Sequence, residues 1–236
     1  MPRQTPGLRA APTPAPLATP ARVHPIASQP LRPPVTRLVL ASNNAGKLVE
    51  LQALFAPLGL SMVAQGVLDI AEAEEPHHTF VENALAKARH AAHHSKQLAI
   101  ADDSGLCVDA LSSAPGVLSA RYATLFGQPK SDADNNRVLI ENMRGQADRH
   151  ARFVCALVAV RSADDPEPLV AMGRWQGTLL HAPQGEGGFG YDPLLFIAQF
   201  GRSVAELSAA LKNAHSHRAI ASTQMLALMR EVWRLG

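Results

Sequence analysis

Two adjacent acidic residues, Asp102 and Asp103, are the first feature of the sequence that indicates chemistry. They follow the apolar run 98–101 and precede Ser104 and Gly105. We expect the run to be a short buried strand that ends at the aspartates, at the edge where α/β proteins collect their ligands. Two carboxylates this close repel each other unless a bound cation, a lysine or a shared proton neutralises them. A simple turn is the alternative, because Asp, Ser and Gly are favoured in turns.

A polar loop at residues 42–47, SNNAGK, is a second candidate binding element. It follows one predicted strand and precedes a predicted helix. Backbone N–H groups and a lysine at a helix N-terminus suit an anion, most naturally phosphate. The G-x-x-x-x-G-K-[ST] pattern of a P-loop is absent. The segment therefore predicts a phosphate site without a P-loop.

Three further segments carry groups that suit a nucleotide. Glu74 and Glu75 come just before a predicted helix. The glycine-rich segment 183–193 allows close approach and contains Phe189 and Tyr191, whose rings can stack on a flat base. Donors to phosphate or to a base edge near the C-terminus are Lys212, His217 and Arg218. Acidic, basic and ring-stacking groups together predict a nucleotide whose phosphates are bridged by a hard cation such as Mg²⁺.

The composition is that of a soluble globular protein. The chain has 236 residues, of which 47% are hydrophobic and 18% charged, and no apolar run reaches the roughly 20 residues of a membrane helix. The two cysteines, Cys107 and Cys155, lie in apolar runs without a CxxC or zinc-ligand pattern. We therefore expect two buried thiols, a reducing compartment and no membrane partner.

The N-terminal residues differ from the rest of the chain. Residues 1–35 contain 10 of the 18 prolines, which indicates a disordered Pro/Ala/Arg-rich tail before a single domain at 36–236. The first 36 residues carry four arginines and no acid, which leaves 18 basic and 20 acidic residues in the remainder. A nearly neutral domain has no broad basic field, so no nucleic-acid partner is expected.

The elements that position these groups alternate between strands and helices. Apolar, β-rich runs predict strands at 36–41, 98–101, 151–160 and 168–180. Apolar residues at helical spacing predict helices at 48–58, 79–96, about 203–212 and about 216–234. Thr79 and Glu82 form a T-x-x-E capping box, and Ser216 is a candidate cap. The alternation predicts an α/β fold with a mixed sheet flanked by helices.

Five histidines raise a separate question about a transition metal. They are His77, His78, His90, His93 and His94. His90 and His94 share one helix face at i, i+4, but no third ligand follows at a suitable spacing. We therefore expect a solvated face.

Six segments resemble, in order, the motifs of one enzyme family. They are LASNNAGKLVEL, EEPHHTFVENALAKA, AIADDSGLCVDAL, APGVLSARYA, GGFGYDPLLF and AELSAALKNAHSHRA. The family is that of the non-canonical purine NTP pyrophosphatases, also called inosine triphosphate or dITP/XTP pyrophosphatases, and the resemblance covers about residues 37–234. The departures are mild: Leu118 replaces a frequent aromatic residue, and SSAPG replaces a frequent G-G-x-P-G. They concern loop detail and leave the chemistry intact.

The resemblance implies both a fold and an activity. The fold is an elongated α/β structure with a long mixed central sheet, two lobes and an active-site cleft between them. The activity is hydrolysis of ITP, dITP and XTP to the monophosphate and pyrophosphate with Mg²⁺, which removes deaminated purines from the nucleotide pool. A cytoplasmic homodimer is expected.

Roles for single residues come from the matching motifs. Asp103 is implied as the general base and, with Glu75, as a metal ligand, and Lys87 helps to polarise the water or a phosphate. The triphosphate is expected at Ser42, Asn43, Asn44, Ala45, Gly46 and Lys47, mainly through Asn43 and Lys47. The other implied substrate-binding residues are Ser104, Phe189, Gly190, Tyr191, Asp192, Lys212, His217 and Arg218.

Selectivity needs donors that face the C6 carbonyl of inosine and xanthosine, where adenosine has an amino group. Arg218 and backbone N–H groups are the candidates. Three rival functions stay open: a pyrophosphatase for other modified nucleotides, a nucleotide-binding module without turnover, and an enzyme that acts on some other phosphate ester. The presence of both Asp103 and Glu75 favours an enzyme, because a binding module needs no base.

Overall fold

The computed structural model describes residues 37–235, and the predicted disordered tail at 1–35 lies outside the described residues. The strands are β1 (Arg37–Leu40), β2 (Ser61–Ala64), β3 (Ala99–Val108), β4 (His150–Val160), β5 (Leu169–Leu179), β6 (Leu195–Ile197) and β7 (Arg202–Ser203). The helices are α1 (Ala45–Phe55), α2 (Phe80–Ser95), α3 (Asp132–Asn142), α4 (Ala209–His215) and α5 (His217–Val232). In the described part, no helix is both long enough and apolar enough to cross a membrane.

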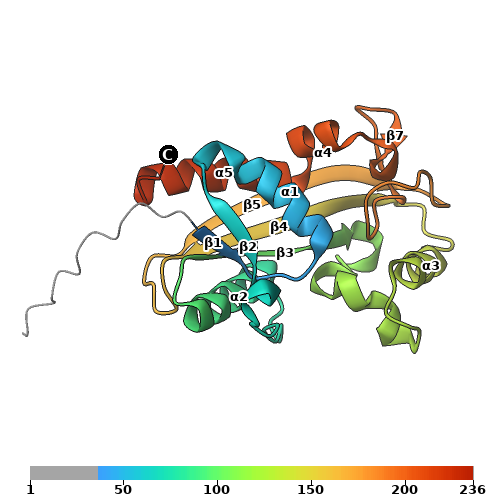
Figure 1. The fold of residues 1–236 in the computed structure, drawn as a ribbon. Coiled ribbons are helices and arrows are strands. Elements are labelled where there is room, and N and C mark those ends of the chain that lie inside the picture. The colour runs from blue at the N-terminus through green and yellow to red at the C-terminus, as the bar shows by residue number, and fades with distance from the viewer. Residues whose placement is uncertain (1–36, 236) are drawn as a thin grey trace, which may run out of the picture. The chain divides into compact units, whose positions relative to one another are not determined.

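The strands form one seven-stranded sheet in the order β2-β1-β3-β4-β5-β6-β7 (Figure 1). Strand β1 pairs in parallel with β2 and β3, whereas every pair from β3 to β7 is antiparallel. The predicted α/β class and mixed sheet are therefore confirmed. Strand β4 lies in the middle of the sheet, which explains its almost continuous apolar sequence.

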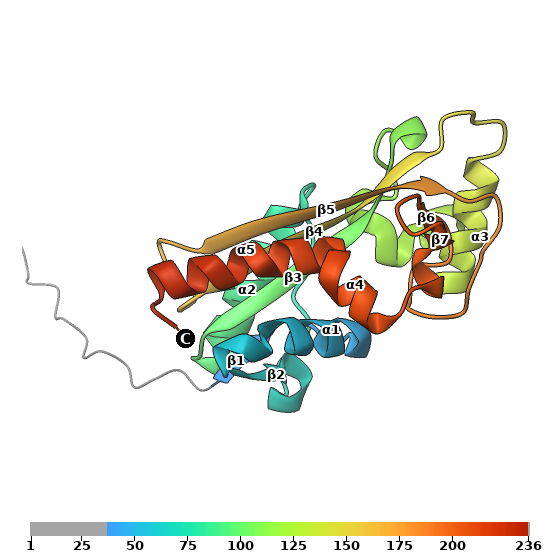
Figure 2. The same cartoon turned by 90° about the horizontal axis from the view of Figure 1, so that it is seen from above.

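Helices cover both faces of the sheet. On one face, α5 lies along the long strands with α1 beside it (Figure 2), and Leu51, Phe55 and Met225 pack against Ile100 and Leu157. On the other face lies α2, whose buried apolar positions are the small residues Ala84, Ala88, Ala91 and Ala92. The faces are therefore closed by different side chains, large from α1 and α5 and small from α2.

A second core fills the far end of the long strands. Leu106, Phe153 and Trp175 come from β3, β4 and β5, and Leu139 and Met143 come from α3. The 3₁₀ segment Gly116–Phe126 adds Tyr122 and Ala123 to this cluster. The long strands thus join two cores, and Asp102 and Asp103 lie on β3 between them.

The prediction that a strand ends at the two aspartates was wrong. Strand β3 continues to Val108, so Asp102 and Asp103 lie inside it and pair in register with Leu157 and Ala156 of β4. Side chains alternate between the two faces of a strand, so the adjacent carboxylates point to opposite sides of the sheet. Pairing along β4 stabilises the extended backbone, and ion pairs on each face neutralise the charges.

The helices were predicted with mixed success. Those expected at 48–58, 79–96 and 216–234 are confirmed as α1, α2 and α5, and Thr79 and Ser216 accept the predicted capping hydrogen bonds. The helix expected at 203–212 was wrong, because a 3₁₀ turn at Val204–Glu206 ends at an extended Leu207 before α4 begins. Sequence patterns also missed α3, whose buried positions include Asn135 and Asn136.

The N-terminal end of α5 packs directly on β5 at Gly173. A Cβ atom here would collide with the backbone oxygen of His217 and lie 2.8 Å from the backbone nitrogen of Ala221. Glycine is therefore the residue that lets the helix approach this closely. The contact fixes the start of α5, where His217 and Arg218 lie.

Gly173→Ala is expected to destabilise the protein by about 1–3 kcal/mol, because the extra methyl group has to push α5 away from the sheet. Urea unfolding measures this loss. Gln176→Ala, at an exposed position of the same strand, is the control and should change stability by less than about 0.5 kcal/mol. Equal stability of the Gly173→Ala variant and the wild type would contradict the packing.

Candidate active site

Asp102 is the centre of a buried network on the α1 and α5 face. Its side chain is fully buried. Its Oδ1 atom accepts from the Lys47 Nζ at 2.7 Å and the Ser104 Oγ at 2.7 Å, and its Oδ2 atom accepts from the Arg218 Nε at 2.8 Å. Burial alone would raise the pKa of Asp102, but Lys47 and Arg218 outweigh it and hold the pKa well below its usual range. Asp102 is therefore a fixed negative charge that places two cations.

Asp103 has separate partners on the α2 face. Its Oδ1 atom accepts from the Lys87 Nζ at 2.8 Å, and the same nitrogen donates to the Glu75 Oε1 at 2.7 Å. The Asp103 Oδ2 atom is buried without a hydrogen-bond partner among the described residues. Burial raises the pKa of Asp103 although Lys87 opposes it, whereas the pKa of Glu75 is lowered because Lys87 and Arg121 outweigh its burial. Lys87 thus joins two carboxylates of different basicity.

The loop before α1 brings Lys47 to the site. Asn44 caps α1, and its side-chain oxygen accepts from the Lys47 backbone N–H at 3.0 Å. No acidic residue lies in the first turn of α1, so its N–H groups and the lysine suit an anion. Asn43 points elsewhere: its Oδ1 atom accepts from the Gly66 N–H at 3.0 Å and its Nδ2 atom donates to Glu72. It therefore ties the 3₁₀ turn after β2 to this loop.

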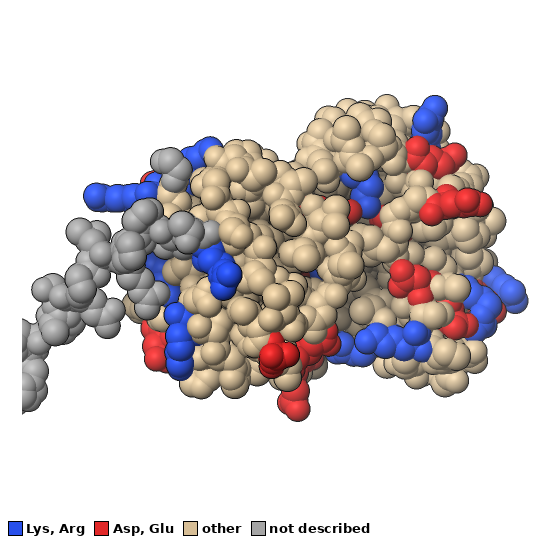
Figure 3. Space-filling model, in the orientation of Figure 1, with Lys and Arg blue, Asp and Glu red and all other residues tan. Residues whose placement is uncertain are grey.

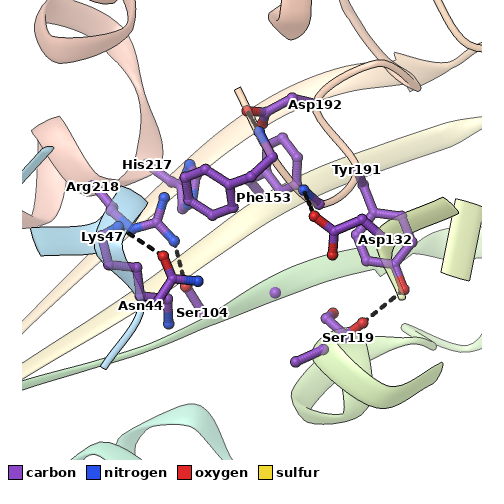
Figure 4. Close-up of a pocket in the computed structure, with 14 residues that line it drawn as sticks. Asn44, Lys47, Ser104, Ser119, Asp132, Phe153, Tyr191, Asp192, His217 and Arg218 are labelled. Carbon is purple, nitrogen blue, oxygen red and sulfur yellow. Dashed lines mark hydrogen bonds between the residues drawn. The ribbon is translucent and has the colours of Figure 1, made fainter. Parts of the chain in front are cut away.

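A cavity of about 150 Å³ lies beyond the start of α5. In Figure 4, Asn44, Lys47 and Arg218 lie on one side of it, and Asp132, Tyr191 and Ser119 on the other. The residues that line it are Asn44, Lys47, Ser104, Gly105, Ser119, Ala120, Asp132, Phe153, Phe189, Gly190, Tyr191, Asp192, His217 and Arg218. Aromatic walls with a few polar groups are typical of a site for a flat organic ring.

His217 contributes a neutral ring to this cavity. It stacks on Phe153 with ring centroids 4.9 Å apart. Burial and the neighbouring Arg218 lower its pKa well below the ordinary histidine value. Its Nδ1 atom is buried without a hydrogen-bond partner among residues 37–235. The ring therefore offers an uncharged polar edge.

A larger cleft of about 600 Å³ adjoins the cavity. Lys47, Lys87, Arg121 and Lys130 line it together with the acidic residues Glu72, Glu74 and Glu75. The two hollows share Asn44, Lys47, Ala120 and Asp132. The site thus has a ring-sized compartment and a charged compartment that meet at the first turn of α1.

A second cationic cluster lies under Phe189. Glu50 accepts from the Lys212 Nζ at 2.8 Å and from the Arg218 Nη1 at 2.9 Å, and Lys212 also donates to Asp192 at 2.9 Å. The Lys212 Nζ and Arg218 guanidinium lie 5.2 and 5.1 Å from the centroid of the Phe189 ring. These cation–π contacts hold the ring between α1 and the start of α5.

Most of the predicted site residues meet at the two hollows. Ser42, Asn44, Lys47, Glu75 and Lys87 line the cleft, and Ser104, the segment 189–192, His217 and Arg218 line the cavity. Two of the remaining predicted residues line neither hollow but form ion pairs with residues that do: Asp103 with Lys87, and Lys212 with Asp192. Gly46 faces Phe189, and Ala45 is exposed at the start of α1. Asn43 faces Gly66.

Sequence reasoning assigned no role to several lining residues. They include Ser119, Arg121, Asp132 and Phe153, and Glu50 behind the wall had no predicted role either. Arg121 donates to Glu75 at 3.2 Å and lies in the motif APGVLSARYA, which therefore carried a signal. Glu50 follows Lys47 by three residues on one helix, a spacing that places both on the same face. Nothing in the sequence pointed to Asp132.

Comparisons with known proteins place the chain in one family. A model described as the Ham1 family matches residues 38–228. A Leptothrix cholodnii protein named dITP/XTP pyrophosphatase is 63% identical over 211 residues, covering 85% of this chain and 100% of the relative. A protein of the same name from Methylibium petroleiphilum is 63% identical over 205 residues, covering 84% and 99%.

Solved structures of proteins with similar sequences have a similar fold. A HAM1 protein from Coxiella burnetii has a TM-score of 0.77 and 40% identity, covering 84% of this chain and 100% of that one. A nucleoside-triphosphatase / dITP/XTP pyrophosphatase from Mycobacterium abscessus has a TM-score of 0.62 and 38% identity, covering 81% and 97%. The resemblance inferred from the six motifs is confirmed, and because the family match spans nearly all of the described residues, the chain belongs to the Ham1 family.

Proposed function

We propose that the protein hydrolyses the non-canonical purine nucleoside triphosphates ITP, dITP and XTP to the monophosphate and pyrophosphate. The Leptothrix cholodnii and Methylibium petroleiphilum relatives are named dITP/XTP pyrophosphatase, which supports this substrate class. The observation that carries the proposal is the pair of adjoining hollows: a ring-sized aromatic cavity and a charged cleft that share Lys47. A nucleoside triphosphate needs both environments at once.

The substrate lies across the first turn of α1 in this proposal. The base enters the cavity beside Phe189, and the polyphosphate extends into the cleft. Lys47 lines both compartments and faces the phosphates, while its ion pair with Asp102 fixes its position. Phosphate is favoured here because the helix N-terminus and the lysine provide donors and positive charge.

Asp103 is the proposed general base. It accepts a proton from the attacking water, whose oxygen then bonds to a phosphorus atom of the substrate. The anhydride bond between the α and β phosphates breaks, and the monophosphate and pyrophosphate are released. The ion pair of Asp103 with Lys87, which lines the cleft, supports this role because it places the carboxylate next to the compartment proposed for the phosphates. Lys47 and Lys87 offset the charge that develops on the phosphates.

Mg²⁺ is the proposed cofactor, held by Glu75 and Asp103. The buried, unpartnered Asp103 Oδ2 supports this, because a hard cation would satisfy that oxygen. Residues 37–235 contain no group of three or more His, Cys, Asp and Glu side chains placed to hold a metal, so phosphate oxygens and water are the expected remaining ligands. When bound, Mg²⁺ would neutralise phosphate charge and lower the pKa of a water.

Selectivity rests on donors that the cavity holds rigidly. Each nitrogen of Arg218 already donates, the Nε to Asp102, the Nη1 to Glu50 and the Nη2 to Ser104. Each Nη atom keeps a second N–H for a ligand. A fixed donor that finds a C6 carbonyl gains a hydrogen bond, whereas the amino group of adenine leaves it unpaired.

The proposal extends to a homodimer and to a cytoplasmic location. The free thiols of Cys107 and Cys155 are buried, which supports a reducing compartment. Most of the face in Figure 3 is formed by uncharged residues, with charged groups of both signs scattered over it, as suits a small-molecule enzyme better than a nucleic-acid binder.

Pyrophosphate release from a panel of nucleotides tests the function. ITP, dITP and XTP are expected to give kcat/KM values at least about 100-fold above ATP, since an unpaired donor in a buried site is costly. EDTA should abolish release and added Mg²⁺ should restore it. A preference for modified pyrimidine nucleotides would favour the first rival function, and saturable ITP binding without any release would favour the binding module.

Asp103→Asn is expected to lower kcat for ITP at least about 100-fold, because the amide cannot accept the proton from water. Binding of ITP, followed by calorimetry, should stay within about tenfold of the wild type, since Lys47 and the cavity are untouched. Asp164→Asn, at an exposed residue of the loop between β4 and β5, is the control and should behave as the wild type. An Asp103→Asn variant that retains more than a few per cent of turnover would refute this assignment.

A further inference from the structure

Helix α3 reaches the site although its sequence gave no functional signal. Ser131 caps the helix by accepting from the Asp134 N–H at 3.0 Å. Asn135 ties it to the 3₁₀ segment Gly116–Phe126, because its side chain accepts from the Ala123 N–H at 2.8 Å. The first residue of the helix, Asp132, lines both the cavity and the cleft. Helix α3 is thus a rigid wall of the site.

Two side chains of α3 bind the backbone of Gly190, which lies in the segment 189–192 that lines the cavity. The Asp132 Oδ2 accepts from the Gly190 N–H at 2.7 Å, a bond drawn in Figure 4. The Asn136 Nδ2 donates to the Gly190 C=O at 3.0 Å. Asp132 and Asn136 are four residues apart, so they lie on the same face of the helix. Both polar groups of the Gly190 backbone are therefore bound by one helix.

Gly190 lies between Phe189 and Tyr191, two of the aromatic residues that line the cavity. Gly190 has a φ of +62°, a conformation that other residues rarely adopt. The segment before it, 183–188, is exposed and contains Gly185, Gly187 and Gly188. The backbone of this segment is anchored at Gln184 and Gly187, whose N–H groups donate to the C=O groups of Pro193 and Ala205, and the Phe189 N–H donates to Asp192. The α3 bonds to Gly190 add to these anchors and further reduce the conformational freedom that a ligand would have to remove on binding.

The hydrogen bonding of Asn136 indicates that its side-chain N–H group is the part that serves the structure. The side chain is buried, and its Oδ1 atom has no hydrogen-bond partner in the described part of the chain. An apolar residue would avoid this unsatisfied oxygen. The bond from Nδ2 to the Gly190 C=O is the gain that offsets it. Asp132 binds the other polar group of Gly190, because its carboxylate accepts a hydrogen bond from the Gly190 N–H.

We propose that Asp132 and Asn136 are positioning residues that clamp Gly190 and so preorganise Phe189 and Tyr191 for the base of the nucleotide. The inference rests on the proposed function for its ligand, but the clamp itself is a property of the free protein. Neither residue takes part in the chemical step. The clamp adds affinity for the nucleoside and leaves the reaction at the phosphates unchanged.

Kinetics and hydrogen exchange together test the clamp in the full chain. Asp132→Ala and Asn136→Ala should each raise KM for ITP about tenfold and leave kcat within about twofold, because a lost positioning bond weakens binding in the ground and transition states alike. Asp132→Asn keeps an acceptor oxygen and should restore most of the affinity. In the doubly substituted protein, the amides of 186–191 should exchange at least about tenfold faster than in the wild type.

Asp134→Ala is the matched control. Asp134 also lies in the first turn of α3, but its side chain contacts Ser131 and Arg137 and not Gly190. The Asp134→Ala variant should lose about as much helix stability as Asp132→Ala, while KM for ITP and amide exchange at 186–191 stay at the wild-type level. A KM change equal to that of Asp132→Ala, unchanged exchange in the double variant, or a fall in kcat with constant KM would each overturn the clamp. If the wild type failed to hydrolyse ITP, the proposed function would fall, and the exchange rates would still decide the clamp.

Discussion

The alternation of side chains along β3 is the constraint on which the rest of the site depends. Asp102 and Asp103 are neighbours in sequence, yet one carboxylate faces α1 and α5 and the other faces α2. A buried charge is costly without partners, and each face provides its own. Asp102 binds Lys47 and Arg218, which fixes two helices at one point of the sheet. Asp103 shares Lys87 with Glu75 and keeps one oxygen free of protein partners within the described residues.

Because the two carboxylates bind different partners on opposite faces of the sheet, the site has two compartments. The cations held by Asp102 lie at the edge of the aromatic cavity, whereas Lys87 and Glu75 line the charged cleft with Asp103 behind them. Long strands make the arrangement possible, because β3, β4 and β5 extend from the core under α1 and α5 to the core under α3. Preorganisation comes from helices on both sides: α1 and α5 fix the cations, and α3 holds the segment that carries the aromatic rings.

Sequence patterns predicted what depends on hydrophobic periodicity. The apolar run 151–160 predicted β4, and the alanine-rich pattern with a T-x-x-E cap predicted α2. Patterns failed where tertiary hydrogen bonds decide the structure. The residues D-D-S-G are typical of a turn, but ion pairs on both faces keep them in β3. Helix α3 buries Asn135 and Asn136, and the cost of burying their amide groups is offset by hydrogen bonds to backbone groups distant in sequence. Family motifs located most lining residues, but they did not separate Asn44, which faces the site, from Asn43, which faces Gly66.

A crystal structure of the protein with a non-hydrolysable analogue of ITP and Mg²⁺ tests the central claim most directly. We expect the cation to bind Asp103 and Glu75, the phosphates to contact Lys47, and the base to lie beside Phe189. Asp102 should keep its bonds to Lys47 and Arg218 and should contact neither the cation nor a phosphate. A cation bound by Asp102, or phosphorus atoms far from Asp103, would contradict the assignment of the two carboxylates to opposite faces and different tasks.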